Sequence, residues 1–222
     1  MRYEIKFFHS FLDFEELKYV IKAHPFIFKE VYSRRQVNNI YFDNSENINF
    51  KDNVEGVRVR RKVRIRWYGS LFGECKNPFL EIKNKVGQLG SKKRFELPEF
   101  QIDRGTNIRS INFFDNLTSV EEKYNYLQFL PFLKPELLNS YERTYYLSQN
   151  KKFRITLDKN MEYYSLFSSK KPLKTFNDAQ NNILELKYDV TSSKEANQIT
   201  KHFPFRVTKS SKYVSGIYRI KI

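Results

Sequence analysis

The sequence predicts an α+β fold: a closed antiparallel β-barrel of about eight strands that forms a charged tunnel, with helices packed outside. Two observations lead to this prediction. At least six of the predicted strands alternate charged with apolar residues, so each strand has one charged face and one apolar face. The charged faces combine Arg and Lys with Glu and Asp, whereas Ser and Thr are scarce on them.

Mixed charge favours the barrel over the alternative architecture, an open sheet whose basic face binds a polyanion such as RNA. Carboxylates on an open basic face would repel phosphates. Inside a tunnel they can offset buried cations and coordinate a divalent metal, and closure removes the edges of the sheet. The carboxylates on the charged faces are Glu4, Glu81, Glu96, Asp158 and Glu185.

The strongest alternation lies in residues 57–68, which read VRVRRKVRIRWY. As a strand, this stretch has an almost purely cationic face and an almost purely apolar one, with Arg61 as the exception. A helix would spread the charges around its circumference, and the β-branched content also favours a strand. The cations that share a face are Arg58, Arg60, Lys62, Arg64 and Arg66.

Similar alternation, bounded by turn residues, predicts the other strands. They cover residues 2–7, 35–42, 80–85, 92–97, 139–147, 153–158 and 182–190. A first helix is expected to begin with an Asp13 N-cap, completed by Glu16 as a capping box, and to end at His24-Pro25.

Less regular segments connect these elements. Further helices are expected over residues 118–133 and, after a capping serine, over residues 193–202. Residues 44–56, 69–78 and 165–178 are expected to be polar links or loops, and residues 207–222 a final helix or strand.

Composition limits the partners and the site chemistry. The 222 residues carry 40 Lys and Arg against 25 Asp and Glu, and this excess predicts a polyanionic partner: nucleic acid, a membrane surface or phosphate-rich small molecules. The length fits a single domain, residues 1–222. Cys75 is the only cysteine, which excludes an intramolecular disulfide and a cysteine-cluster zinc site. No signal peptide or membrane span is recognisable, so a soluble cytoplasmic protein is expected.

Nine short motifs in a fixed order resemble those of the VTC domain. This domain is the polyphosphate polymerase of the vacuolar transporter chaperone complex and its bacterial relatives, within the triphosphate tunnel metalloenzymes (the CYTH superfamily). The motifs are RYEIKF at 2–7, IYFDN at 40–44, RIRWYG at 64–69, LEIKNK at 80–85, KKRFEL at 92–97, SYERTYY at 140–146, FRITLD at 153–158, LELKYD at 184–189 and KSSKY at 209–213.

The resemblance implies a role for each matching residue. Catalytic contacts to the phosphates are implied for Arg64, Arg66, Lys83, Arg143 and Lys212. Substrate binding is implied for Lys6, Lys92, Arg94, Tyr141 and Arg154, and we add Arg58 of the basic stretch and Lys209 of the KSSKY motif. Glu185 matches the carboxylate that coordinates a divalent metal, expected to be Mn²⁺ or Mg²⁺. The aromatic rings of Trp67, Tyr145 and Tyr146 are expected to pack rather than to stack on a base.

The function implied is metal-dependent transfer of the γ-phosphoryl group of ATP to a growing polyphosphate chain. The acceptor oxygen is already ionised, so no general base is required, and transfer relies on positioning and charge stabilisation. The alternatives are a tripolyphosphatase or nucleoside triphosphatase of the same fold, and a non-enzymatic module that binds polyphosphate or RNA. ATP and polyphosphate are the expected partners; no nucleic acid and no membrane span are expected, and a membrane-protein partner stays open.

Overall fold

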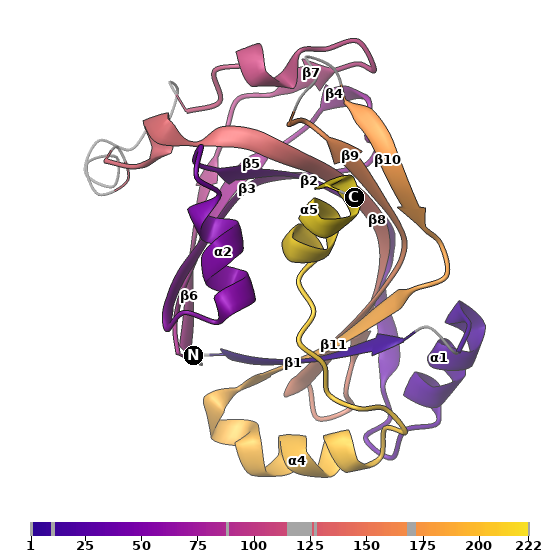
Figure 1. Cartoon of the computed structure of the whole chain (residues 1–222). Helices are drawn as coiled ribbons and strands as arrows, with labels where there is room; N and C mark the ends of the chain where they lie inside the picture. Colours follow the sequence, from indigo (N-terminus) through magenta and orange to yellow (C-terminus); the bar gives the residue numbers. More distant parts are fainter. Residues whose placement is uncertain are drawn as a thin grey trace.

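An antiparallel sheet of nine strands dominates the structure (Figure 1). The computed structural model describes residues 2–9, 12–87, 89–114, 126, 128–167 and 172–221. Along the sheet the strand order is β1-β11-β9-β8-β2-β3-β5-β6, β10 pairs with β9, and β4 pairs with β7 in a separate small sheet. The strands are β1 (Arg2–His9), β2 (Lys29–Asp43), β3 (Val59–Tyr68), β4 (Gly73–Cys75), β5 (Phe79–Val86), β6 (Leu89–Glu96), β7 (Phe100–Ile102), β8 (Lys134–Leu147), β9 (Phe153–Ser165), β10 (Leu173–Asp178) and β11 (Asn182–Asp189).

Helices are short in the described part of the chain. The α-helices there are α1 (Phe14–Lys22), α2 (Ile48–Glu55), α4 (Ser193–Lys201) and α5 (Lys212–Lys221). Single 3₁₀ turns are η1 (Ile108–Ser110), η2 (Leu130–Phe132) and η3 (Val190–Ser192). No helix of the described residues is long and apolar enough to cross a membrane.

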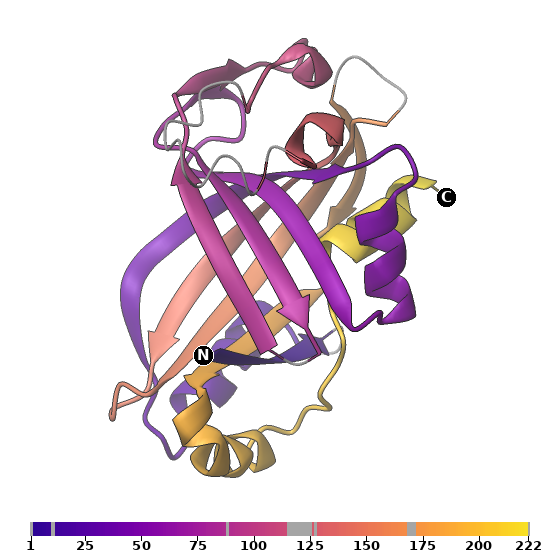
Figure 2. The same ribbon diagram turned by 90° about the vertical axis from the view of Figure 1, so that its left-hand side faces the viewer.

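The main sheet curves around an interior, as two views at right angles show (Figures 1 and 2). Its edge strands are β1 and β6. Strand pairing within the described residues does not join these two edges, although Lys83 of β5 forms an ion pair with Glu4 of β1 at 2.7 Å. Curvature therefore brings both ends of the sheet together, whereas closure by backbone hydrogen bonds stays a prediction.

The outer face of the sheet carries two apolar cores, as the alternating pattern requires. One contains Trp67 of β3 and Cys75 of β4, both fully buried. The other joins Phe7 of β1 to Leu17 of α1 and Ile199 of α4. Each large apolar side chain buried in this way contributes about 1.5–3 kcal/mol to folding. The cores thus form on the faces opposite the charged residues.

Helix α5 departs from the prediction that the helices pack outside. It lies against the inner face of the sheet, where Tyr213 and Ile217 join a third apolar core with Leu137 and Tyr163 (Figure 1). A Cβ atom added to Gly216 would come within 2.4 Å of the Leu137 side chain and 2.7 Å of the Tyr163 ring, so a larger residue here would force these buried side chains to shift. At this end of the interior the inner face is apolar rather than charged, which explains why it accepts a helix.

Several predicted elements are confirmed. The basic strand becomes β3, and the capping box of α1 is present: the Glu16 backbone N–H donates to the Asp13 carboxylate at 2.9 Å, and the Asp13 N–H donates to the Glu16 carboxylate at 2.7 Å. Residues 212–221 form a helix, so of the two alternatives predicted for the C-terminal segment, helix or strand, the helix is confirmed. The serine that precedes α4, Ser192, makes no capping bond with its side chain, so that capping prediction is wrong.

Three elements lie in segments that were predicted to be links or loops. Residues 44–56 contain α2, whose N-terminal N–H groups are capped from a distance: the carboxylate of Asp43 accepts from the N–H groups of Asn49 and Phe50, each at 2.9 Å. Residues 165–178 contain β10, which extends the sheet by pairing with β9. The short strand β4 lies in the segment 69–78, which was predicted to be a loop. The helix predicted over residues 118–133 falls mostly outside the described residues.

Candidate active site

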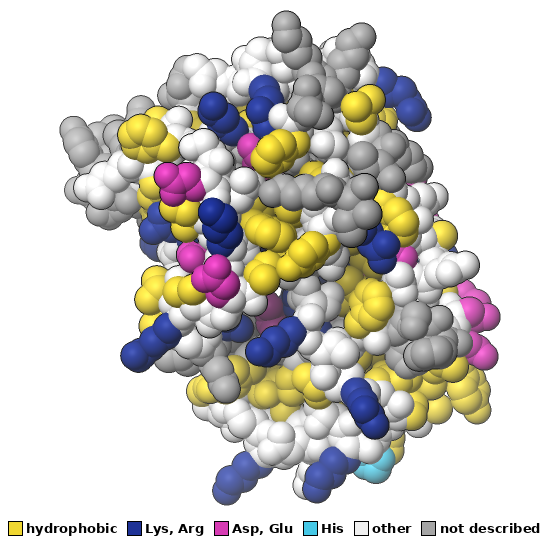
Figure 3. Space-filling model, viewed as in Figure 1, with side chains coloured by type: hydrophobic (Ala, Val, Ile, Leu, Met, Phe, Trp, Pro, Cys, Tyr) yellow, Lys and Arg dark blue, Asp and Glu magenta, His cyan; other side chains and the backbone are white. Residues whose placement is uncertain are grey.

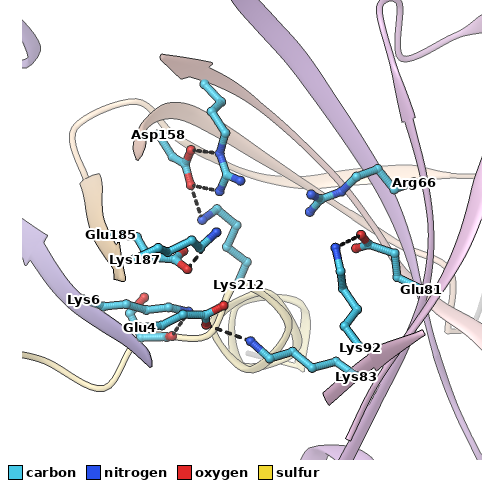
Figure 4. Close-up of polar contacts among 12 residues, drawn as sticks. Glu4, Lys6, Arg66, Glu81, Lys83, Lys92, Asp158, Glu185, Lys187 and Lys212 are labelled. Carbon is cyan, nitrogen blue, oxygen red and sulfur yellow. Dashed lines mark hydrogen bonds and ion pairs between the residues drawn. The ribbon is translucent and has the colours of Figure 1, made fainter. Parts of the chain in front are cut away.

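The charged faces of the strands converge on the interior of the sheet (Figure 4). Strand register explains the convergence, because directly opposite residues in an antiparallel pair share a face. Lys6 stands opposite Glu185, and Arg64 stands opposite Glu81. Arg143 likewise stands opposite Asp158. Cations and carboxylates therefore alternate around the inner face, and three groups of ion pairs result.

The first group, which we call the Asp158 cluster, joins β8, β9 and α5. Both oxygens of the fully buried Asp158 carboxylate accept from the Arg143 guanidinium, at 2.5 and 2.7 Å, and Lys212 Nζ donates to the second oxygen at 2.5 Å. Burial raises the pKa of Asp158, but Arg143 and Lys212 outweigh it and lower the pKa to about 2. Both cations are consequently held in place by one ionised carboxylate.

Lys212 reaches this cluster because α5 is anchored along its length. The Tyr213 hydroxyl donates to the buried Asp43 carboxylate at 2.6 Å, the same carboxylate that caps α2. Further along, Arg219 pairs with Asp178 of β10 at 3.3 Å, and Gly216 allows close contact with the sheet. The IYFDN and KSSKY motifs are therefore joined by a hydrogen bond that fixes the first turn of α5.

The segment before α5 also enters the interior. Lys6 Nζ donates to the Ser210 carbonyl at 2.9 Å, and Lys62 Nζ donates to the Ser211 hydroxyl at 2.7 Å. Burial and the nearby cations Lys6 and Lys83 keep the pKa of Lys62 well below its usual value. Lys62 was not among the predicted site residues, although its parity in the basic strand already placed it on the same face as Arg64.

The second group, the Glu81 cluster, joins β3, β5 and β6. The Arg64 guanidinium donates to one oxygen of the buried Glu81 carboxylate at 2.6 and 2.8 Å, and Lys92 Nζ donates to the other at 2.8 Å. Burial raises the pKa of Glu81, but Arg64, Arg66 and Lys92 outweigh it and keep the pKa well below the usual value. Here the Lys92 side chain is 52% exposed, so one cation of the cluster stays in contact with solvent.

Arg66 lies between the two clusters (Figure 4). Its guanidinium donates to the Asn39 side-chain carbonyl at 2.8 Å and to the Tyr141 hydroxyl at 3.1 Å, and it is 7% exposed. Within the described part of the chain no carboxylate forms an ion pair with it. Burial raises the pKa of Tyr141, but Arg143, Arg66 and Lys212 outweigh burial and lower the pKa to about 8.

The third group joins β1, β5 and β11. Glu185 pairs with Lys187 at 3.1 Å, and Glu4 pairs with Lys83. Burial raises the pKa of Glu185, but Lys187 and Lys6 outweigh it and hold the pKa well below its usual value. Burial and the Glu185 carboxylate each raise the pKa of Glu4, and Lys83 leads the cations that still lower it overall. Both carboxylates are therefore ionised and close enough to influence each other.

These two carboxylates provide the donors that a hard divalent cation needs. Among the described residues, no group of three His, Cys, Asp or Glu side chains is arranged to bind a metal. Mg²⁺, however, is usually held by one or two carboxylates together with phosphate oxygens and water. Glu4 and Glu185 fit that mode, with the substrate supplying the other oxygen ligands. The sequence favoured pairing with tunnel cations over metal ligation for Glu4, and the structure shows it both paired with Lys83 and close to Glu185.

The structure brings most of the predicted site residues together. The convergent set comprises Lys6, Arg64, Arg66, Lys83, Lys92, Tyr141, Arg143, Glu185 and Lys212. Arg58, Arg154 and Lys209 are exposed, and Arg58 precedes the first residue of β3. Arg94 is also exposed and lies 3.3 Å from the centre of the Phe79 ring. These four residues take no part in the three ion-paired groups.

Trp67 and Tyr146 are fully buried in the outer cores, as expected for packing residues. His24 is also a packing residue: it lies among the rings of Phe26, Phe28 and Phe203, and its Nε2 lies 3.1 Å from the Ile199 carbonyl.

Comparison with known structures supports the architecture. The chain is similar to a candidate adenylate cyclase from Vibrio parahaemolyticus, with a TM-score of 0.52 and 8% identity, covering 99% of this chain and 98% of that one. It is similar to another from Bacillus halodurans, with a TM-score of 0.52 and 14% identity over 97% and 96% of the chains. A third, from Hippeastrum and described as having a dominant triphosphatase activity, has a TM-score of 0.50 and 13% identity over 98% and 96%.

Sequence comparison identifies the family. No curated protein matches the chain in sequence. The model of the VTC domain, in contrast, matches residues 1–221. The match spans all the motifs whose cations and carboxylates meet inside the sheet, and the solved structures above share the fold of this chain. The chain therefore belongs to the VTC domain family.

Proposed function

We propose that this protein is an ATP-dependent polyphosphate polymerase that transfers the γ-phosphoryl group of ATP to the end of a polyphosphate chain. The observation that carries the proposal is the convergence of buried Arg and Lys side chains on one interior, in a member of the VTC domain family. A polyanion with closely spaced charges matches such a site. Guanidinium groups bind phosphate oxygens bidentately, and ammonium groups act as point charges.

Internal carboxylates explain how the site is stable without phosphate. Asp158 and Glu81 each bind two cations, so each carboxylate takes the position that a phosphate group can take. Incoming phosphates compete with these carboxylates for Arg143, Arg64 and their neighbours. Among the described residues no carboxylate forms an ion pair with Arg66, so its guanidinium can bind phosphate without first breaking an ion pair.

A divalent cation would be held by Glu185, with Glu4 as the second carboxylate. When bound, Mn²⁺ or Mg²⁺ neutralises charge that develops on the phosphate oxygens. The side chains of the protein would position the phosphates. Arg66 on β3 and Arg143 on β8 would orient them from the sheet, and Lys212 would do so from α5. No described side chain needs to act as a general base, because the oxygen of the acceptor chain is already ionised.

Hydrolysis is the second candidate, and the Hippeastrum neighbour supports it because a triphosphatase activity is described for that protein with this fold. Water would then replace the chain as the acceptor. Binding of RNA to the outer surface has less support. The face shown in Figure 3 carries its Lys and Arg side chains dispersed among apolar groups rather than gathered in one continuous patch.

The test is to incubate the purified protein with ATP and either Mn²⁺ or Mg²⁺, and to measure polyphosphate on a stained gel and free phosphate in the same reaction. We expect long chains together with ADP, abolished in Glu185→Gln and unchanged in Glu195→Gln, which alters a half-buried glutamate of α4 that pairs with Lys152, outside the three groups. Phosphate without chains would identify a triphosphatase. Neither product with either metal would overturn both enzymatic proposals.

A further inference from the structure

Three tyrosines surround one arginine at the end of the interior. The Arg35 guanidinium lies 5.4, 5.7 and 5.8 Å from the ring centres of Tyr32, Tyr68 and Tyr145, respectively. The rings of Tyr32 and Tyr145 also meet edge to face, with their centres 5.7 Å apart. We call these four residues the tyrosine–arginine collar. They come from three adjacent strands, β2, β3 and β8.

A β-bulge in β2 is needed to assemble the collar. Tyr32 stands opposite Tyr145, and Arg35 stands opposite Arg143, so β2 has two residues between these pairs where β8 has only Thr144. In a regular strand, residues three apart point to opposite faces. The extra residue turns Tyr32 and Arg35 to the same face, which is the inner one. Bulges are concentrated near active sites, where they redirect a side chain.

The collar is continuous with the phosphate-binding cations. Tyr68 is two residues beyond Arg66 on β3, and Tyr145 is two residues beyond Arg143 on β8. Two residues along a strand advance about 7 Å on the same face. The collar therefore begins one step beyond the two buried arginines, while α5 occupies the interior on the other side of Arg143.

Exposure separates the collar from the packed aromatic residues. Tyr32 is 49% exposed and Tyr68 is 37% exposed, whereas Trp67 and Tyr146, their neighbours in sequence or space, are fully buried. Arg35 is exposed too, and within the described residues it forms no ion pair with a carboxylate. Tyr145 is half-buried. Solvent-accessible aromatic rings beside a guanidinium provide a surface on which nucleobases can stack.

We propose that the tyrosine–arginine collar binds the base of a nucleoside triphosphate whose phosphates lie on Arg66 and Arg143. The inference rests on the proposed function, and it reassigns Tyr145, which the sequence suggested was a packing residue. A nucleotide joins an aromatic ring to a polyanion, and the collar joins aromatic rings to the polycationic interior in the same order. Inorganic tripolyphosphate has the anion alone and would leave the collar unused.

Stacking also predicts the base preference. Ring faces and a guanidinium plane bind any base, because every base has a π-face. Purines offer the larger face. We therefore expect ATP and GTP to bind with similar affinity and more tightly than CTP or UTP.

The test compares ATP with inorganic tripolyphosphate by titration calorimetry in the presence of Mg²⁺. Tyr145→Leu and Tyr68→Leu should each weaken ATP binding roughly tenfold, as loss of one base-stacking ring does, and change tripolyphosphate binding by less than about twofold. Tyr145→Phe keeps the ring and should bind ATP like the wild type. Tyr19→Leu alters an exposed tyrosine of α1 and is the matched control.

Outcomes for the two proposals are distinguishable. If wild-type protein binds ATP no more tightly than tripolyphosphate, or if the Leu variants weaken both ligands equally, the collar does not bind the base. Failure of the wild type to bind tripolyphosphate would instead overturn the phosphate site and the proposed function. The ratio of the two affinities, measured on each variant, removes the effect of any general loss of folded protein.

Discussion

The Asp158 and Glu81 clusters have the same composition, one buried carboxylate between an arginine and a lysine, but different surroundings. In the Asp158 cluster both cations are nearly buried, with side-chain exposures of 8% and 9%. In the Glu81 cluster the corresponding values are 25% for Arg64 and 52% for Lys92. The cations of the Asp158 cluster, which we call the buried wall, are thus paired away from solvent. The cations of the Glu81 cluster, the exposed wall, are paired but remain near solvent.

Helix α5 causes this difference. It brings Lys212 to the Asp158 cluster and covers that end of the inner face with apolar side chains. The Glu81 cluster lies toward edge strand β6, and its Arg64 and Lys92 side chains keep their contact with solvent. We infer that the buried wall provides a preformed set of phosphate contacts, and that the exposed wall can release its cations to an incoming chain at lower energetic cost.

The largest expected effect comes from removing the central carboxylate of each cluster. Asp158→Asn should lower the free energy of unfolding by about 3–5 kcal/mol, because two buried cations lose their counterion. Glu81→Gln should cost clearly less, since water can hydrate Lys92 and part of Arg64. Urea denaturation of both variants measures the difference. Equal losses would show that the two walls are energetically alike.

Arg66 lies between the walls, and its loss should affect turnover more than folding. Arg66→Ala should reduce kcat at least roughly hundredfold, the effect of removing one preorganised donor from a charged transition state. Its neighbours Ile65 and Trp67 supply the packing and are fully buried on the opposite face. Steady-state kinetics and circular dichroism together provide the readout.

Arg61 is the matched control on the same strand. Its side chain stacks on Phe129, with the guanidinium 3.7 Å from the ring centre, on the outer face. Arg61→Ala should therefore leave kcat unchanged. If Arg66→Ala unfolds while Arg61→Ala loses activity, the assignment of inner and outer faces is wrong.

Tyr213→Phe tests whether α5 distinguishes the two walls. The variant removes the hydrogen bond to Asp43 and leaves a buried carboxylate oxygen with one donor fewer, at a cost of about 1–3 kcal/mol. Phosphate binding at the buried wall should weaken, because Lys212 begins the same helical turn. Tyr218→Phe, on the same helix but 48% exposed, is the control. The affinity for tripolyphosphate is measured by titration calorimetry. If both variants bind it equally well, the hydrogen bond from Tyr213 to Asp43 does not position Lys212.

The smallest expected effect is a dependence on pH. Tyr141 has a pKa lowered to about 8, so above that pH it becomes an anion beside Arg66 and Arg143. A bound phosphate favours the protonated form, and affinity for tripolyphosphate should fall as the pH rises through 8, by up to about tenfold per pH unit. Tyr141→Phe should reduce this decline. A wild-type affinity that stays constant between about pH 7 and 9 would exclude the effect.

Period-two alternation determined much of the fold from the sequence. A strand such as β3 must place its cations on one face and Val63, Ile65 and Trp67 on the other, whatever surrounds it. The mixed charge of these faces predicted that cations and carboxylates share one side of the sheet, and the ordered motifs predicted the family to which the chain belongs. The capping box of α1 was similarly predictable, because its partners are three residues apart.

Other features became apparent only in the tertiary structure, because they depend on residues that are distant in the sequence. The cap of α2 comes from Asp43 through side-chain oxygen atoms, and β10 is a strand because it pairs with the end of β9 that β11 does not reach. The inner position of α5 depends on an apolar end of the interior, built from β2, β8 and β9. The collar depends on a bulge that shifts the register of β2 by one residue, and local propensity carries no sign of that shift. Each of these features depends on contacts between residues that are far apart in the chain. The local sequence pattern carries no information about such contacts.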